Sequence, residues 1–250
     1  MGMEDRVSLV VGGTGGIGSA VVRRLVADGM SVVFTYRSSS DHAEALIEEV
    51  GDAASARSLD LADEAGIADV VDSVAADGGG LGSVVYAAGP RVPQIHLSRV
   101  DPADFTTALH AEVSPFFAVV HAALPHLRDG GGSIVAVTTA ATDRYAVRDG
   151  LSAGPKAAIE SLVRGFAAEE GRFGVRVNAV GPGMLGDGMA TELIAAGHYD
   201  ERALEIARQN IAMRSFGTCA DVAEAVCFLA SDRAGYISGQ VLNVDGGYSL

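Results

Sequence analysis

The sequence contains no tryptophan, only two cysteines and few basic residues for its length of 250. Cys219 and Cys227 do not have the spacing of a metal site, and we expect both to be reduced structural residues. Lysine and arginine together number 18 against 32 acidic residues, which gives a formal net charge of −14. This balance argues against nucleic acid as a partner, because nucleic-acid binding relies on basic side chains that neutralise phosphates.

Long apolar runs are also missing from the chain. No stretch reaches the roughly 20 consecutive apolar residues that a helix needs to cross a bilayer, so no membrane partner is expected. The N-terminal stretch MGMEDRVSLVVGG runs from acidic residues and one arginine straight into a glycine-rich turn. This order predicts a first β-strand instead of a signal peptide, and the cytoplasm is the expected location.

Short apolar runs alternate with helical periodicity along almost the whole chain. The apolar runs predict strands at 7–12, 31–36, 54–59, 83–89, 133–139, 175–180 and 240–245. The periodic stretches predict helices at 16–28, 40–50, 63–77, 101–128, 152–172 and 218–230. The last helix has a capping box from Thr218 to Asp221. Because strands rich in Val, Ile and Ala indicate burial on both faces, we expect one α/β domain with a doubly wound parallel sheet of about seven strands.

The segment 181–217 interrupts this alternation because it is too long for a simple crossover. Four glycines between positions 181 and 188 suggest a hinge, and the amphipathic stretch after them suggests a substrate lid at about 184–215. Several apolar residues suggest an adaptable lid surface for an apolar substrate: Met184, Leu185, Met189, Leu193 and Ile194. An ordinary surface helical hairpin fits the same pattern.

A cluster of glycines separates the first predicted strand from the first predicted helix, at positions 12, 13, 15, 16 and 18. Glycines allow a tight turn and a close approach of the backbone to a pyrophosphate, while the helix N-terminus faces negative charge. Because this cluster opens an alternating domain, it predicts a Rossmann-type dinucleotide site. The other interpretation is a merely tight turn between a strand and a helix.

The spacing Gly12-x-x-x-Gly16-Ile17-Gly18 resembles that of the short-chain dehydrogenase/reductase family. Further matches follow in chain order: YAAG at 86–89, GSIVAVTTAA at 132–141, KAAIESLVRGFAAE at 156–169, RVNAVGPG at 176–183 and SGQVLNVDGG at 238–247. The resemblance covers essentially the whole chain. It implies a single dinucleotide-binding domain over 1–250.

The end of the second predicted strand distinguishes NAD from NADP. An acidic residue there would repel a 2′-phosphate, but this chain has Arg37 and Ser38 and no carboxylate before Asp41. Arginine can pair with the phosphate and serine can donate to it, so NADP(H) is the expected cofactor, although a solvated arginine is the other interpretation. The resemblance implies further cofactor contacts at Gly12, Thr14, Gly15, Gly16, Ile17, Gly18, Asp60, Leu61, Ala87, Ala88, Gly89, Lys156, Pro182, Gly183 and Leu185.

The resemblance also implies a reaction that uses four side chains. In the family, a tyrosine acts as general acid toward a carbonyl oxygen, a lysine lowers the pKa of that tyrosine, a serine orients the carbonyl and an asparagine holds a relay water. Here Lys156 is present and Thr139 keeps the hydroxyl, but Ser152 stands where the tyrosine is expected. Glu112 falls at the asparagine position, although a slip of one or two residues would put Ala111 or His110 there.

Ser152 cannot simply replace a tyrosine, because its hydroxyl is a far weaker acid and lies nearer the backbone. One interpretation is an NADPH-dependent reductase of a carbonyl or enone on a small hydrophobic substrate. Its proton would come from bound water or from a displaced donor such as Tyr145, His110 or Glu112. A second is non-redox dehydration or cyclisation with Glu112 or Asp187 as base. A third is a catalytically weak NADP-binding subunit.

Two predicted helices carry more apolar surface than one contact with a sheet requires. The stretches FFAVVHAAL and AAIESLVRGFAA are consistent with a helix bundle between subunits. The family usually forms tetramers through these helices, so a homotetramer or a homodimer is expected. The alternative is that both apolar faces are buried inside one subunit. No metal is expected, because the histidines lack the mutual spacing of ligands.

Overall fold

The structure, a computed structural model, describes residues 6–187 and 201–250. Within these ranges, seven parallel strands form one sheet in the order β3-β2-β1-β4-β5-β6-β7. The strands are β1 Val7–Val11, β2 Val32–Tyr36, β3 Ala54–Ser58, β4 Leu81–Tyr86, β5 Gly132–Val137, β6 Val175–Pro182 and β7 Val241–Val244. This confirms the predicted doubly wound parallel sheet.

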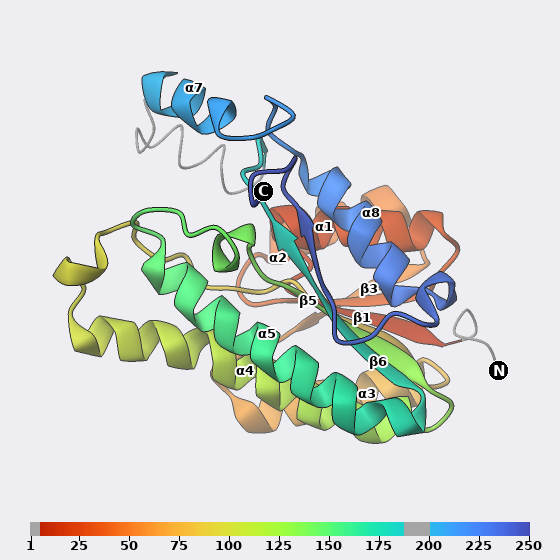
Figure 1. The fold of residues 1–250 in the computed structure, drawn as a ribbon. Helices are drawn as coiled ribbons and strands as arrows, with labels where there is room; N and C mark the ends of the chain where they lie inside the picture. The colour runs from red at the N-terminus through yellow and green to blue at the C-terminus, as the bar shows by residue number, and fades with distance from the viewer. Residues whose placement is uncertain (1–5, 188–200) are drawn as a thin grey trace.

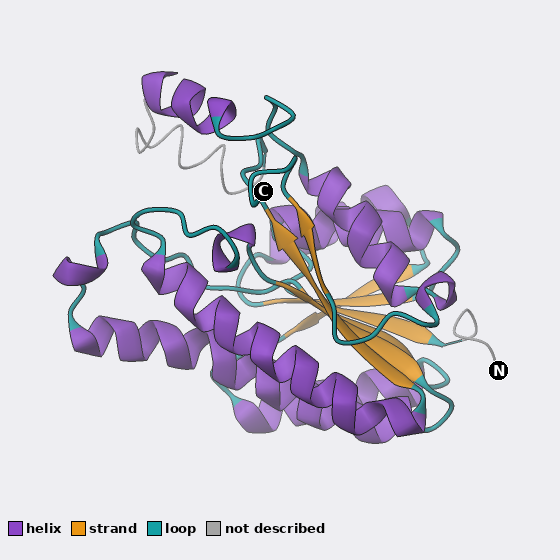
Figure 2. Cartoon of the chain, in the orientation of Figure 1, coloured by secondary structure: helices purple, strands orange, loops and turns teal. Residues whose placement is uncertain are grey.

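Helices cover both faces of the sheet (Figure 1, Figure 2). One face carries α3, α4 and α5, and the other carries α1, α2 and α8. The helices are α1 Gly16–Ala27, α2 Ser40–Val50, α3 Glu64–Asp77, α4 Pro102–Arg128, α5 Gly150–Glu170, α7 Glu201–Gln209 and α8 Cys219–Ala230. Short 3-10 helices are η2 Leu97–Arg99, η3 Ala140–Thr142, η4 Gly171–Phe173 and η5 Asp232–Ala234.

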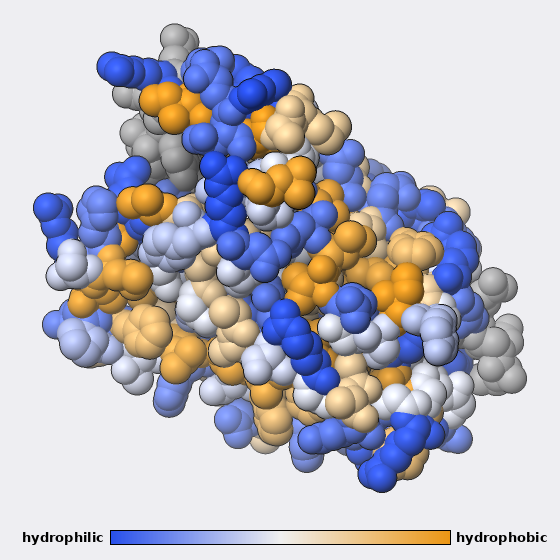
Figure 3. Space-filling view, in the orientation of Figure 1, coloured by the Kyte–Doolittle hydropathy of each residue, from blue (hydrophilic) through white to orange (hydrophobic). Residues whose placement is uncertain are grey.

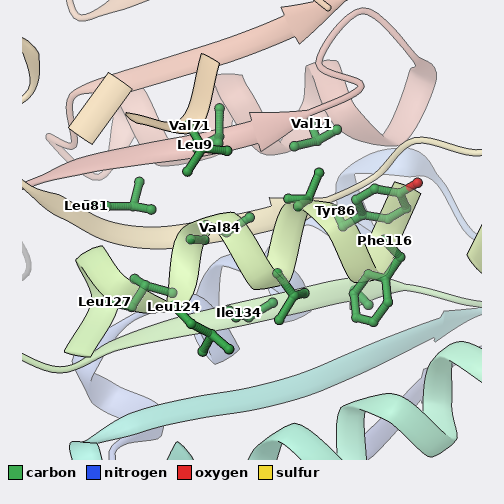
Figure 4. Close-up of a cluster of buried hydrophobic side chains, with 14 of the residues drawn as sticks. Leu9, Val11, Val71, Leu81, Val84, Tyr86, Phe116, Leu124, Leu127 and Ile134 are labelled. Carbon is green, nitrogen blue, oxygen red and sulfur yellow. The ribbon is translucent and has the colours of Figure 1, made fainter. Parts of the chain in front are cut away.

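The apolar strands bury side chains on both faces, as their composition predicts. Every residue of β1 and β5 is buried. On the face covered by α4, Leu9, Val84 and Ile134 belong to one cluster with Phe116 and Leu127 (Figure 4). Burying each such side chain contributes about 1.5–3 kcal/mol. This packing fixes the strands whose carboxyl ends carry the candidate site.

Helix α4 is long and apolar enough to cross a membrane by length and composition alone. In this fold it packs against α3, α5 and the sheet, and its buried residues include Phe116, Val120 and Leu127. A core helix passes the same test. On the face shown in Figure 3, apolar residues are interspersed among polar ones.

The chain changes direction in the sheet between β1 and β4. From β1 it moves outward through β2 to β3, and it then returns to β4 on the other side of β1. The loops that leave the carboxyl ends of β1 and β4 therefore separate, and folds of this kind bind ligands in the crevice between such loops. The glycine-rich turn and residues 87–89 both lie at this point.

The predicted element boundaries agree with the structure to within a few residues. β4 ends at Tyr86, so residues 87–89, which the prediction assigned to this strand, begin a loop instead. α5 begins at Gly150, two residues before its predicted start. The capping box of α8 is confirmed, because Thr218 and Asp221 each accept a hydrogen bond from the backbone of the other.

Candidate active site

The turn after β1 requires glycine at two positions. Gly12 has φ +85°, and a Cβ atom there would lie 2.8 Å from the backbone of Ala88 in the loop after β4. A Cβ atom at Gly18 would collide with the carbonyl oxygen of Gly12. Thr35 holds the turn from β2, because its hydroxyl accepts from the Gly12 amide at 3.1 Å and its carbonyl accepts from the Gly13 amide at 2.9 Å. The backbone therefore closes tightly around the start of α1.

Helix α1 begins with backbone donors that no side chain caps. Its N-cap residue is Gly15, and its first turn contains no acidic residue. Free N–H groups at the positive end of a helix dipole form an anion site. Thr14, Gly16 and Ile17 surround this turn and are exposed or half-buried. A dinucleotide pyrophosphate fits this arrangement.

The loops after β2 and β3 form the edge next to this turn. Arg37 and Ser38 follow β2 and are both exposed. Asp60 fixes the turn after β3, because its carboxylate accepts from the Ala62 amide at 3.1 Å. Leu61 packs against the core cluster beside it. This edge offers a cation and hydroxyls for a phosphate and an apolar side chain for a base.

Tyr86, the last residue of β4, is buried at 1% exposure. Its ring packs edge-to-face against Phe116, with the centroids 5.4 Å apart. Burial, together with the charge of Glu112, raises the pKa of the Tyr86 phenol. This phenol therefore stays neutral and buried. The next residue, Ala87, donates from its amide to the Val11 carbonyl at 2.9 Å, which holds the β4 loop beside β1.

A buried ion pair joins α4 to α5 below this loop. Lys156 Nζ lies 2.5 Å from Glu112 Oε1, and the two side chains are only 13% and 6% exposed. Lys156 also donates to the Val137 carbonyl at the end of β5, at 3.0 Å. A Cβ atom at Gly89 would lie 3.2 Å from Glu112 Oε2 and 3.4 Å from Lys156 Nζ, so the loop passes directly over the pair. The Val137 carbonyl takes one of the three ammonium donors, and the charge of the ammonium faces the Glu112 carboxylate.

The structure distinguishes the three candidates for the inward position on α4. Glu112 is 5% exposed, whereas Ala111 and His110 are exposed. Because helical neighbours point in different directions, only one of the three can reach α5. The alignment puts Glu112 at the family's asparagine position, and Glu112 is the one of the three that points inward; its catalytic role stays a prediction.

Thr139 and Ser152 are the two hydroxyl side chains that the sequence analysis selected as candidate catalytic residues. Thr139 follows β5, and its hydroxyl accepts from the Ala141 amide at 3.2 Å. Ser152 lies one helical turn before Lys156 on α5 and is half-buried. Its amide donates to the Asp149 carbonyl at 3.0 Å. Burial raises the pKa of the Asp149 carboxyl to about 6, although a hydrogen bond from Ser152 and the charge of Lys156 lower it. The sequence analysis did not select Asp149, although an acidic residue three positions before Ser152 at a helix start could have indicated it.

A family model described as enoyl-(acyl carrier protein) reductase matches residues 12–249. The chain belongs to the short-chain dehydrogenase/reductase family. It is an oxidoreductase that acts on carbonyl or alcohol groups. Members of this family use a nicotinamide dinucleotide, and the turn after β1 fits such a cofactor.

Related proteins match almost the whole chain. Versicolorin reductase stcU of Emericella nidulans is 33% identical over 254 residues, which cover 98% of this chain and 96% of that protein. The short chain dehydrogenase/reductase AacuN of Aspergillus aculeatus is 35% identical over 259 residues, with the same coverage of 98% and 96%. Among solved structures, a short-chain type dehydrogenase/reductase from Mycobacterium ulcerans has a TM-score of 0.90 and 31% identity, covering 100% of this chain and 91% of the other. ElxO with NADP bound has a TM-score of 0.90 and 26% identity, covering 98% of each chain.

Three other candidate proton carriers of this short-chain dehydrogenase/reductase lie in less suitable places. Asp187 accepts from the Cys219 amide at 2.9 Å and so caps the start of α8. Tyr145 is 48% exposed, and His110 is exposed on α4.

Cys219 is buried, and burial is the main cause that raises the pKa of its thiol to about 12, which fits the expected structural role.

The segment after β6 connects the site to the C-terminus. Pro182 ends β6 and is buried, and the Gly183 amide donates to the Val244 carbonyl of β7 at 2.9 Å. Leu185 forms an isolated parallel bridge with Gly217. Two parts of the predicted lid at 184–215 are described, residues 184–187 and residues 201–215, and α7 lies in the second part. Met189, Leu193 and Ile194 lie outside the described residues.

Proposed function

We propose that the protein is an NADPH-dependent reductase that reduces a carbonyl or enone on a hydrophobic substrate, within a single domain over 1–250. The observation that carries this proposal is the placement of Lys156. Its ammonium lies at the carboxyl end of the sheet, directly below the loop that continues β4. A lysine held there suits a nicotinamide ribose beside the glycine-rich turn.

The preference for NADPH rests on the loop after β2. Arg37 and Ser38 are exposed at the sheet edge next to the anion site of α1, and no acidic residue precedes Asp41. A guanidinium pairs with a phosphate by two parallel hydrogen bonds, whereas a carboxylate at this place would repel it. The solved ElxO structure with NADP bound supports the same choice by similarity.

The cofactor supplies a hydride to the substrate carbon when it is bound. Thr139 and Ser152 would then orient the substrate oxygen through their hydroxyls, and Lys156 would hold the ribose. Glu112 would keep Lys156 in place and balance its charge in a buried setting, where an unpaired ammonium is costly. The phenol that the family uses is replaced by weaker acids, so we expect slower proton delivery than in members with tyrosine.

The substrate class rests on similarity and on the surface of the segment after β6. Two relatives are named versicolorin reductases, which describes those proteins. Met184 and Leu185 are half-buried at the start of the predicted lid. A small ketone or enone on a hydrophobic skeleton is the substrate class that we propose.

A homotetramer or homodimer in the cytoplasm completes the proposal. On the outer side of α4 and α5, Phe117 is 46% exposed and lies 5.6 Å from the Phe166 ring and 6.3 Å from the His121 ring, centroid to centroid. Such an aromatic group on two adjacent helices suits a helix bundle between subunits. Light scattering of the protein and of a Phe117→Asp variant tests this, because the variant should have the lower mass.

The activity itself is tested with a panel of hydrophobic ketones and enones. Oxidation of NADPH is followed by absorbance, together with product analysis. We expect ketone-dependent oxidation that is faster with NADPH than with NADH. Product that forms equally well after removal of the nucleotide would favour non-redox chemistry. Tight NADPH binding without oxidation of any panel member would favour the binding subunit.

A further inference from the structure

Glu160 is a buried carboxyl of α5 that the proposed reaction does not use. It lies one helical turn after Lys156 and is 4% exposed. Its direct partner is a hydroxyl, because Thr142 Oγ lies 2.9 Å from Glu160 Oε1. Burial favours a neutral carboxyl over a charged one, and it raises the pKa of Glu160 above its ordinary value although the hydrogen bonds of Glu160 lower it.

Thr142 connects Glu160 to the candidate reaction centre. Its hydroxyl oxygen lies 2.9 Å from the Thr139 carbonyl and also 2.9 Å from Glu160 Oε1. A hydroxyl carries one proton, so it donates to only one of these oxygens at a time. Both contacts are hydrogen bonds when Glu160 is protonated, because the carboxyl then donates to Thr142 Oγ and Thr142 donates to the Thr139 carbonyl. The two distances thus fit a hydrogen-bonded chain from Glu160 to the backbone of Thr139.

The backbone at Thr139 is held from two sides. On the side of β6, the Val180 carbonyl accepts from the Thr138 amide at 2.8 Å and from the Thr138 hydroxyl at 3.3 Å. On the side of η3, the Thr139 carbonyl accepts from the Thr142 amide at 3.3 Å and from its hydroxyl at 2.9 Å, so the hydroxyl makes the closer contact. Thr139 Oγ accepts from the η3 backbone, which leaves its proton for a substrate oxygen.

Two charged side chains act on Glu160 among the described residues. Arg164 lies one turn further along α5 and is exposed, and its charge favours the ionised carboxyl. Asp143 directly follows η3 and is also exposed, and its charge disfavours the ionised carboxyl. Lys156 faces Glu112 of α4 instead. The two charges on Glu160 oppose each other, so burial decides the direction.

We propose that Glu160 is a positioning residue that holds the Thr139 backbone through Thr142, so that the Thr139 hydroxyl meets the substrate oxygen. This proposal rests on the proposed reductase function. Glu160 touches neither substrate nor cofactor in this role. When its carboxyl loses the proton, it accepts the hydrogen bond of Thr142, and the Thr139 carbonyl loses the closer of its two donors. The alignment of the Thr139 hydroxyl then loosens.

Substitutions of Glu160 and Thr142 test this role in steady-state reduction of a ketone by NADPH. Glu160→Leu fills the buried space but cannot donate to Thr142, so we expect kcat to fall about 10–100-fold, as is usual when a reacting group is misplaced. KM for the ketone and the Kd for NADPH should change little, because the lost contact aligns the reacting atoms. Thr142→Val should have the same effect.

Two conservative variants should keep the rate. Glu160→Gln can donate to Thr142 from its amide group, and Thr142→Ser keeps the hydroxyl of the chain. We expect kcat within about twofold of the unaltered protein for both, which is a small change in the free energy of activation. A loss in Glu160→Gln as large as that in Glu160→Leu would overturn the donor role of the carboxyl.

Glu170→Leu is the matched control for Glu160→Leu. Glu170 is another buried carboxyl of α5, 5% exposed, and it pairs with Arg128 at the far end of the helix. Its replacement should lower stability and leave kcat unchanged. Equal losses of kcat in Glu170→Leu and Glu160→Leu would show that any damage to α5 slows the reaction, and would overturn the positioning role.

Two further readouts follow the proton of Glu160. In the unaltered protein, kcat/KM should fall as pH rises through the raised pKa of Glu160, and Glu160→Gln should lack this fall because its amide donates at every pH. Without cofactor or substrate, the backbone carbonyl ¹³C signal of Thr139 reports its hydrogen bonds in NMR spectra. This signal should shift over the same pH range in the unaltered protein and not in Glu160→Gln.

The outcomes separate this proposal from the function on which it rests. If Glu160→Leu keeps the kcat of the unaltered protein, the positioning role is refuted while the reductase stands. Losses in Glu160→Leu and Thr142→Val that multiply in the double variant refute it as well, because two members of one chain should lose the same contact. If the unaltered protein oxidises NADPH with no carbonyl compound, the reductase function fails, and the positioning role falls with it whatever the Thr139 signal shows.

Discussion

Lys156 and Glu112 form an ion pair with Nζ and Oε1 2.5 Å apart, and both side chains are largely removed from solvent. In the family pattern, the corresponding lysine has a neutral asparagine nearby and acidifies a tyrosine. Here a carboxylate balances the ammonium at the same place. We infer from the sequence resemblance that two changes, a serine for the phenol and an acid beside the lysine, bear on the same proton transfer.

The buried pair should contribute strongly to stability. In Glu112→Gln, the ammonium loses its counter-charge in a buried setting, and we expect a loss of about 3 kcal/mol in the free energy of unfolding by urea denaturation. Glu49→Gln is the matched control, because the Glu49–Arg23 pair is 52% and 45% exposed. It should cost no more than about 1 kcal/mol. Equal losses in the two variants would contradict the importance of the buried pair.

The glycine turn should tolerate no side chain at position 18. Gly18→Ala places a Cβ against the Gly12 carbonyl, so we expect the Kd for NADPH, measured by fluorescence titration, to rise at least about tenfold. Gly165→Ala is the control, since Gly165 is an exposed residue of α5 and a Cβ atom there would meet nothing within 4 Å. It should stabilise the protein by about 0.5–1 kcal/mol and leave NADPH binding unchanged. Unchanged NADPH affinity in Gly18→Ala would argue against a cofactor at this turn.

Arg37 should determine the choice between the two nucleotides. Arg37→Ala removes a charge-assisted contact worth about 1.5–3 kcal/mol, so the Kd for NADPH should rise about 10–100-fold while that for NADH changes little. Arg172→Ala removes a cation that precedes β6, at the amino end of a strand four places from β2 in the sheet, and should change neither value. Parallel weakening of NADPH and NADH in Arg37→Ala would contradict a 2′-phosphate site.

Asp149 should lower stability near neutral pH. Its carboxyl has a pKa of about 6 in the folded chain, and the unfolded value is about 3.9, so the folded state binds the proton more tightly. The contribution to stability is therefore present below about pH 4 and is lost as pH rises through about 6. Asp149→Asn lacks this loss and should be more stable relative to the unaltered protein at pH 7 than at pH 4, as measured by urea midpoints. The same difference at both pH values would contradict the raised pKa.

Restoring the family's phenol should have an effect that depends on Glu112. Ser152→Tyr introduces a stronger acid, but the Lys156 charge that would lower its pKa is balanced by Glu112. We expect a modest gain in ketone reduction from Ser152→Tyr and a gain of about tenfold or more when Glu112→Asn is added. Steady-state rates of the two single variants and the double variant check this. Simple additivity would show that the two positions act independently.

The fold could be predicted from the sequence because its signals are local. Short, largely apolar runs such as β1 and β5, in which every residue is buried, indicate central parallel strands, and Thr218 and Asp221 mark the start of α8. The structure begins α5 at Gly150, two residues before the predicted start, with Asp149 at the N-cap.

The contacts within the candidate site were harder to predict. The alignment left Glu112 open to a slip of one or two residues, and only the packing of α4 against the sheet shows which of the three side chains points inward. The pairing of Glu112 with Lys156 depends on two helices that meet far apart in the sequence. The raised pKa of Asp149 depends on burial, which a single sequence does not encode in any short motif.

Titration of the purified protein with NADPH, followed by nucleotide fluorescence or by calorimetry, tests the central claim most directly. The account predicts saturable binding with a Kd in the micromolar range, tighter for NADPH than for NADH. Absence of binding by both nucleotides at millimolar concentration would contradict it.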